Sequence, residues 1–422
     1  MGKNYKGYIH VIILMMAGTL HGIDNPHFYR ANFFWQEPRF ATDWLTTWDV
    51  LVAAGETKKA FNKNGNKTPL LNIFGLHDMQ FLGENVPNLD PSNPLDEILI
   101  ELQALPTRDN FGKFLFKGDF SSIEGVINGY QNLAHGFFVQ AYLPLRRLAI
   151  TNINFIDQSP DDSVFPNKNT PLWRSFIDNF SEILLEHGLT IKSVHESGCG
   201  DFTLLGGWTL NYLDTCYVDY YDVTAKVGLL FPTARTRNLA NPFDLPLGYD
   251  GFYGLPLKFD CSFGYWEWLT AGAHIGALFL FDRTKTVAMR TSQEQNGFII
   301  LTRGKAKVDP GTLWEIQTYA KADHILRGFS WLVGYCFTLK DADCIKPKNK
   351  LIFPPAIVNN DARFKSWRMH VIHWFLEYDF AQSPSDIGPR IGCYYNWIVG
   401  GRRIFDTDMA GVSLGIDVEW CF

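Results

Sequence analysis

The stretch Ala410–Phe422, with the sequence AGVSLGIDVEWCF, decides the fold that we expect for this chain. Every even position from 410 to 422 is apolar, whereas the odd positions hold small or charged residues and one cysteine. Successive side chains of a β-strand point to opposite faces, so this segment would have one apolar face and one polar face. The alternation predicts a half-buried strand. A strand of a water-soluble sheet would show the same pattern, so the segment alone leaves two fold classes open.

The other end of the chain favours export. Lys3 and Lys6 precede an apolar run from Tyr8 to about Leu20, and small residues surround its end. This order is typical of a secretory signal peptide, which we place at residues 1–22. A buried N-terminal strand is the alternative.

The terminal stretch resembles the last strand of Gram-negative outer-membrane β-barrels, whose assembly machinery recognises a final aromatic residue preceded by alternating apolar residues. The residues at these positions are Leu414, Ile416, Val418, Trp420 and Phe422. The resemblance covers this one stretch, and it implies a bacterial outer-membrane location, with outer-membrane lipid and the barrel-assembly machinery as partners. Residues 23–43 would then form a periplasmic segment, and residues 44–422 the barrel.

Alternating segments recur along the chain and predict an all-β fold, a transmembrane antiparallel up-and-down barrel of about twelve strands. We expect the strands at residues 44–56, 112–130, 136–149, 202–214, 221–232, 253–264, 268–282, 311–323, 326–338, 365–378, 388–401 and 408–422. Fourteen strands would result if Lys67–Gly75 paired with the first one. The alternation in Trp367–Tyr378 changes phase near His370, which predicts a bulge.

The connections between these segments give a second argument for a barrel. Long and short connections alternate almost to the end of the chain, which places the long loops together on the outer face. Aromatic residues make up 15% of the chain, and Trp and Tyr favour membrane interfaces. We expect such positions for Trp48, Trp208, Trp268, Trp331, Trp397 and Trp420.

Composition excludes two other classes of protein. No apolar run after residue 20 is long enough for a membrane-spanning helix. The formal net charge is −6 and no basic stripe occurs, so nucleic acid is not an expected partner.

Two amphipathic helices are expected inside the long outer loops. One lies around residues 94–105, and the other around residues 171–187, with Thr170 as its N-cap and Gly188 as its terminator. They could cap the barrel mouth, narrow the lumen or lie on the outer leaflet; we favour a cap or a constriction.

The sequence gives no reason to expect catalysis. His370 and His373 look like a metal pair, but residues three apart on a regular strand point to opposite faces. Phosphate-loop and Cys-x-x-Cys motifs do not occur. We therefore expect no metal, no cofactor and no enzyme activity.

The polar faces of the strands predict what would line the lumen. The candidates are Lys226, Asp260, His274, Glu315, Gln317, Lys321, Arg368, His370, Arg390, Asp417 and Glu419. Charges of both signs indicate a wet interior without sharp ion selectivity. The sequence thus favours a channel for passive or substrate-selective diffusion of a small solute. A barrel-embedded hydrolase of the lipase or protease type and a non-conducting structural or adhesive barrel are the alternatives, and the oligomeric state stays open.

Overall fold

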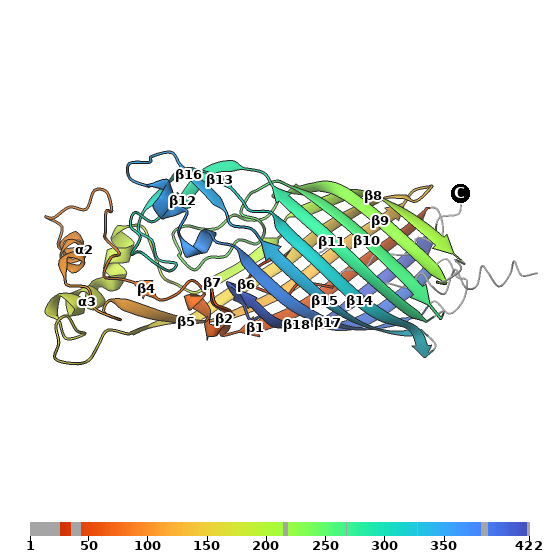
Figure 1. Ribbon diagram of the computed structural model, residues 1–422, viewed down its shortest axis with the longest axis horizontal. Helices are drawn as coiled ribbons and strands as arrows, with labels where there is room; N and C mark the ends of the chain where they lie inside the picture. The colour runs from red at the N-terminus through yellow and green to blue at the C-terminus, as the bar shows by residue number, and fades with distance from the viewer. Residues whose placement is uncertain are drawn as a thin grey trace, which may run out of the picture.

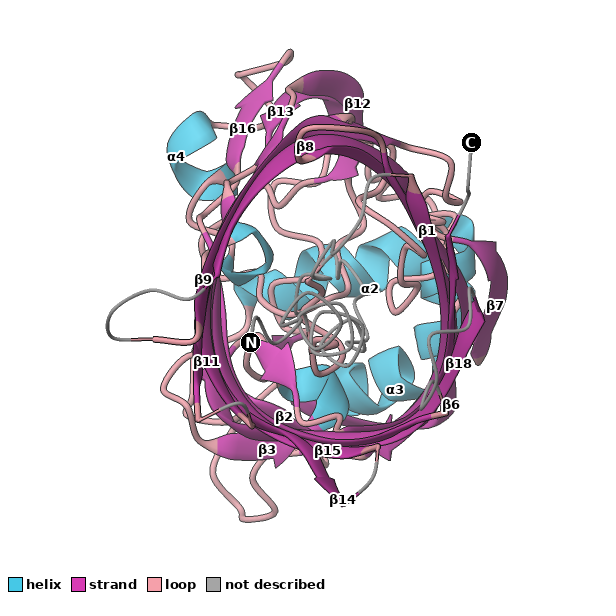
Figure 2. Ribbon diagram, turned by 90° about the vertical axis from the view of Figure 1, so that its right-hand side faces the viewer, coloured by secondary structure: helices cyan, strands magenta, loops and turns pink. Residues whose placement is uncertain are grey.

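The computed structural model describes residues 26–34, 44–213, 218–266, 268–326, 328–380 and 387–419. The predicted signal peptide and the terminal residues Trp420 and Phe422 lie outside these ranges. Within them, twelve antiparallel strands close into a barrel (Figures 1 and 2). Each strand pairs with its neighbours in sequence, and the last pairs with the first from Leu45↔Glu419 to Ala54↔Ala410.

All twelve predicted strands are present. They are β1 (Leu45–Thr57), β5 (Lys113–Asn132), β6 (Phe137–Asp157), β8 (Phe202–Leu213), β9 (Tyr220–Phe231), β10 (Gly254–Tyr265), β11 (Leu269–Leu280), β14 (Leu313–Leu326), β15 (Phe329–Lys340), β17 (Trp367–Asp379), β18 (Ile387–Arg402) and β20 (Met409–Glu419). The stretch 67–75 does not join the wall. It forms β3 (Lys67–Pro69), which pairs with β2 (Lys59–Phe61), and a short 3-10 helix (Leu70–Asn72).

The alternation of the terminal stretch separates an outer from an inner face, as predicted. Val412, Leu414 and Ile416 are 52%, 56% and 37% exposed on the outside, whereas Ser413 is fully buried inside. Five of the six tryptophans expected at interfaces are outward and exposed, and Trp420 lies beyond the described residues. A band of outward apolar side chains on a closed sheet is what a membrane-spanning barrel requires.

A bulge occurs beside His370 as expected, but it lies on β18 and not on β17, which keeps its phase. Pairing with β18 jumps from His370↔Gly400 to Val371↔Ile398, so the extra residue is Val399 on the neighbouring strand. Odd residues of β17 stay buried from Trp367 to Asp379. The apparent change of phase arises because polar residues lie on the outer face at the start of this strand.

The two ends of the barrel differ (Figure 1). Short links such as residues 133–136 lie at one end, the turn end, and the long connections lie at the other, the loop end. At the loop end a small sheet consists of β12 (Arg283–Ala288), β13 (Arg303–Asp309) and β16 (Cys344–Pro347), followed by α4 (Pro355–Val358). The strands β5 and β6 extend past the others there and pair with β4 (His77–Asp78) and β7 (Val194–Cys199).

The two predicted helices are α2 (Pro94–Ala104) and α3 (Pro171–Glu186), which pack against each other. They lie beyond the loop end of the barrel and not within it, and a view along the barrel shows them behind the lumen (Figures 1 and 2). Thr170 is the N-cap residue of α3, but its hydroxyl accepts a hydrogen bond from the Asn167 N–H (3.0 Å) instead of capping the helix. Among the described residues no helix has the length and apolar character needed to span a membrane.

Candidate solute path

Most of the predicted lumen residues lie on the inner face of the barrel. The side chains of Lys226, Asp260, His274, Glu315, Gln317, Lys321 and Arg390 are buried there, and that of Asp417 is half-buried among them. Glu419 is the last residue of β20, and its side chain lies outside what the structure describes.

Partners across neighbouring strands hold these inner side chains. Arg390 donates to Asp49 (3.0 Å) and to Asp417 (2.8 Å). His274 Nδ1 lies 2.8 Å from Asp260 Oδ1. Charges taken out of water need such partners, so the wall itself satisfies much of the inner charge.

Arg368 and His370 correct the prediction, because both lie on the outer face. His370 Nδ1 lies 2.7 Å from the hydroxyl of Tyr335, which is 41% exposed on the outside of β15. His373 points inward and contacts Asn396 Oδ1 (3.0 Å). The two histidines therefore cannot share an ion, and no group of three or more metal-ligating side chains occurs among the described residues.

Residues 26–34, which we call the lumen segment, also correct the prediction of a periplasmic segment. They run inside the barrel. Phe405 N–H donates to the Phe28 carbonyl (2.8 Å), and Ala31 N–H donates to the Thr407 carbonyl (2.9 Å). Further along, the Phe34 ring lies 5.5 Å from those of Tyr319 and His373. The segment thus contacts several sides of the wall and obstructs the lumen.

The strongest polar contact of the lumen segment is made by Arg30. Its Nε lies 2.8 Å from Glu124 Oε1 on β5, and Arg146 of β6 approaches the other oxygen of the same carboxylate (3.1 Å). All three side chains are almost completely buried. Arg146 Nη1 also lies 2.9 Å from His27 Nε2.

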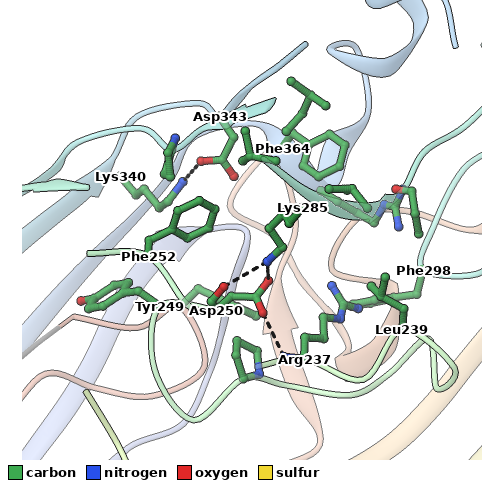
Figure 3. Close-up of a pocket in the computed structure, with 18 of the residues that line it drawn as sticks. Arg237, Leu239, Tyr249, Asp250, Phe252, Lys285, Phe298, Lys340, Asp343 and Phe364 are labelled. Atoms are coloured by element: carbon green, nitrogen blue, oxygen red, sulfur yellow. Dashed lines mark hydrogen bonds and ion pairs between the residues drawn. The ribbon is translucent and has the colours of Figure 1, made fainter. Parts of the chain in front are cut away.

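A cavity of about 250 Å³ lies at the loop end, directly on the lumen segment. Pro26, His27, Phe28 and Tyr29 line it from the barrel side. The remaining walls come from distant loops and strand ends and are largely apolar; they include Leu280, Ile300 and Trp367. Figure 3 labels five more of these apolar residues: Leu239, Tyr249, Phe252, Phe298 and Phe364.

Charged residues around this cavity are mostly basic. Lys285 pairs with Asp250, Lys340 with Asp343, and Arg363 with Asp361. Three further cations line the cavity without a salt bridge in the described part of the chain: Arg237, Lys365 and Arg403.

The side chains of Arg237 and Arg403 each donate to one backbone carbonyl and form no salt bridge in the described part of the chain. Burial lowers the pKa of Arg237, whose Nη2 donates only to the Pro242 carbonyl (2.6 Å). Arg403 donates to the Ser366 carbonyl (3.0 Å), while its Nε is buried with no hydrogen-bond partner among the described residues. An apolar cavity with half-buried basic side chains that form no salt bridge in the described part of the chain suits a small solute that has an apolar body and an anionic group.

Sequence reasoning missed the lumen segment and its partners. An inward arginine could have been predicted at Arg146 or Arg147, because one of two adjacent arginines on a strand must face inward. Glu124 lies within a predicted strand on the inner-face register and could have been added on the same ground. For Arg30 and for the cavity we find no such signal, since neither belongs to an alternating segment.

No protein-family model and no curated protein matches this sequence. Among solved structures, the chain is similar to an outer membrane channel from Pseudomonas putida F1 at 11% identity, covering 89% of this chain and 96% of that one with a TM-score of 0.48. It is also similar to the NanC porin (11% identity, 71% and 94% covered, TM-score 0.32). A third likeness is to the CymD monoaromatic hydrocarbon channel (8% identity, 90% and 89% covered, TM-score 0.32).

Proposed function

We propose that this protein is an outer-membrane channel for small solutes with an apolar body and an anionic group, and that passage requires movement of the lumen segment. The band of outward apolar side chains supports a position of the barrel within a membrane. The long connections would then face outward from the cell. The turn end would then face the periplasm.

The proposed class of substrate rests on one observation: the apolar cavity, with basic residues in its wall, lies directly on the lumen segment. A solute bound there would contact Phe28 and lie next to the chain that blocks its way. A cavity of about 250 Å³ is smaller than most drug-binding pockets, so the solute is small. The obstructed lumen favours selective passage over free diffusion.

Flux through reconstituted vesicles tests the preference for anions. We expect benzenesulfonate to cross faster than phenyltrimethylammonium, which has a similar ring and the opposite charge. Arg237→Gln with Arg403→Gln removes the two unpaired guanidinium groups. Each hydrogen bond to a charged group contributes about 1.5–3 kcal/mol, so the double variant should lower the preference for benzenesulfonate by at least about tenfold.

Lys307→Gln is a matched control, because Lys307 is an exposed cation of the same loop region that pairs with Asp282 (2.6 Å) outside the cavity. Its flux ratio should equal that of the unaltered protein. Equal flux of both aromatic ions through the unaltered protein would overturn the assignment of substrate class. If neither ion crossed, the proposed channel function would be overturned.

A further inference from the structure

Two arginines lie side by side on the outside of the barrel at the loop end. Arg368 is the second residue of β17, Arg402 is the last residue of β18, and the two are direct partners across the strands. Both side chains are on the outward face. Like charges directly opposite each other in a sheet are destabilising, so this pair calls for a counter-ion.

The described residues do not supply that counter-ion. In the described part of the chain neither arginine forms a salt bridge, and Arg368 Nε is buried without a hydrogen-bond partner. The acidic residues that follow Arg402 are already engaged: Asp406 pairs with Lys67 (2.6 Å), and Asp408 accepts a hydrogen bond from Tyr395 (2.7 Å).

A third cation lies on a turn that contacts the end of β18. The turn that begins at Asn62 contacts the end of β18, where the Asn62 carbonyl accepts a hydrogen bond from the Arg403 N–H (3.4 Å). This turn carries Lys63, which is exposed and has no salt bridge among the described residues. Arg368, Arg402 and Lys63 together form what we call the rim cluster.

The wall below the rim cluster is largely apolar. On the outward face the first row toward the turn end is Phe337, His370 and Gly400, in three adjacent strands, and the second row is Tyr335, Ile372 and Trp397. His370 and the Tyr335 hydroxyl bind each other, and Gly400 leaves open space at the position opposite His370. Positive charge thus lies above a largely apolar surface that has a shallow gap.

We propose that the rim cluster binds the phosphate of an anionic lipid in the leaflet around the loop end, with the acyl chains lying on the apolar wall below. Guanidinium groups bind phosphate through paired hydrogen bonds, and basic clusters at membrane interfaces bind lipid head groups. A lone arginine at an interface can extend into water. Two adjacent arginines, one of which has a buried Nε without a hydrogen-bond partner among the described residues, are stabilised more by binding one shared anion. The inference rests on the barrel lying in a membrane and is independent of what it transports.

Native mass spectrometry of the protein released from detergent micelles tests this site, with diphosphorylated lipid A as the probe. Arg368→Gln with Arg402→Gln should lower the lipid-bound fraction at least tenfold. Arg147→Gln is the control, because Arg147 is a single outward arginine flanked by Ile123 and Ser197, and it should change binding less than twofold. Heat-modifiable gel migration verifies that each variant is folded, and Arg402→Gln alone, at the exposed end of β18, replaces the double variant if that one does not fold.

Two further probes separate the possible sources of phosphate. Dephosphorylated lipid A should bind at least tenfold more weakly than the phosphorylated form, and inorganic phosphate at equal concentration should not displace the lipid. Unchanged binding by the arginine variant, equal binding of dephosphorylated lipid, or full displacement by inorganic phosphate would each overturn the proposal.

Discussion

Glu124 is the acidic centre of the contact between the lumen segment and the barrel wall. It accepts from Arg30 and from Arg146 in a completely buried site. Glu124→Gln would leave two buried guanidinium groups without their counter-charge, and breaking such a pair costs about 3–5 kcal/mol. We expect the free energy of unfolding, measured by urea titration in detergent, to fall by about that amount.

Asp119→Asn is the matched control on the same strand. Asp119 pairs with Lys58 (3.2 Å), whose side chain is 77% exposed, and such surface pairs contribute about 0–1 kcal/mol. If both variants lost the same stability, the buried contact of the lumen segment would have no special role.

His77 makes the loop end sensitive to acid. Burial against Phe116, Phe243 and Phe298 lowers the pKa of His77 from 6.5 to about 3, and neither ring nitrogen has a hydrogen-bond partner among the described residues. The unfolded state therefore binds more protons than the folded state between these two values. Stability from this residue is complete above pH 6.5 and is lost as the pH falls toward 3.

His77→Phe should remove that contribution. Between pH 7 and pH 4.5 the variant should gain roughly 2–3 kcal/mol relative to the unaltered protein. Hydrogen exchange of the amides at the start of β5, compared between the two proteins at each pH, measures this difference. A difference that stays constant with pH would show that His77 does not remain neutral in the folded loop end.

At the scale of elements, α3 belongs to a hydrophobic core at the loop end that also includes Tyr29 of the lumen segment. Trp173 is fully buried beside Phe111, Phe114 and Phe176, and its Nε1 donates to Asp157 (2.8 Å). Trp173→Ala should destabilise this cap by about 3–5 kcal/mol. We expect protease cleavage near α3 to accelerate while the heat-modifiable migration of the barrel stays unchanged; loss of both together would indicate a single cooperative unit.

Strands and helices could be predicted from the sequence because each follows a local period. The terminal stretch alternates over its whole length, and Pro171 and Gly188 mark the ends of α3. The predicted inward positions of Arg368 and His370 are wrong because a polar residue on a barrel strand need not face inward. Near a membrane interface the outer face also carries polar side chains, so polarity does not determine the face there.

At the scale of the whole molecule, closure of the barrel could be predicted, but the contents of its lumen could not. Alternation in twelve segments specifies the wall. The lumen segment has no period of its own, and its place depends on contacts such as that of Asn32 with Thr338, more than 300 residues away in sequence. The cavity joins residues from Pro26 to Arg403, so only the folded chain brings its charges together.

The measurement that most directly tests the account is solute flux through a barrel whose lumen segment can be locked. Asn32 Nδ2 lies 3.7 Å from Sγ of Cys336, a free and buried cysteine of β15, so Asn32→Cys places a thiol within reach of it. Mass spectrometry verifies that the disulfide forms, and Asn32→Ser under the same oxidant is the control. We predict that benzenesulfonate flux falls to the background of empty vesicles when the disulfide forms and returns on reduction. Equal flux in the oxidised and reduced states would contradict a path that the lumen segment closes.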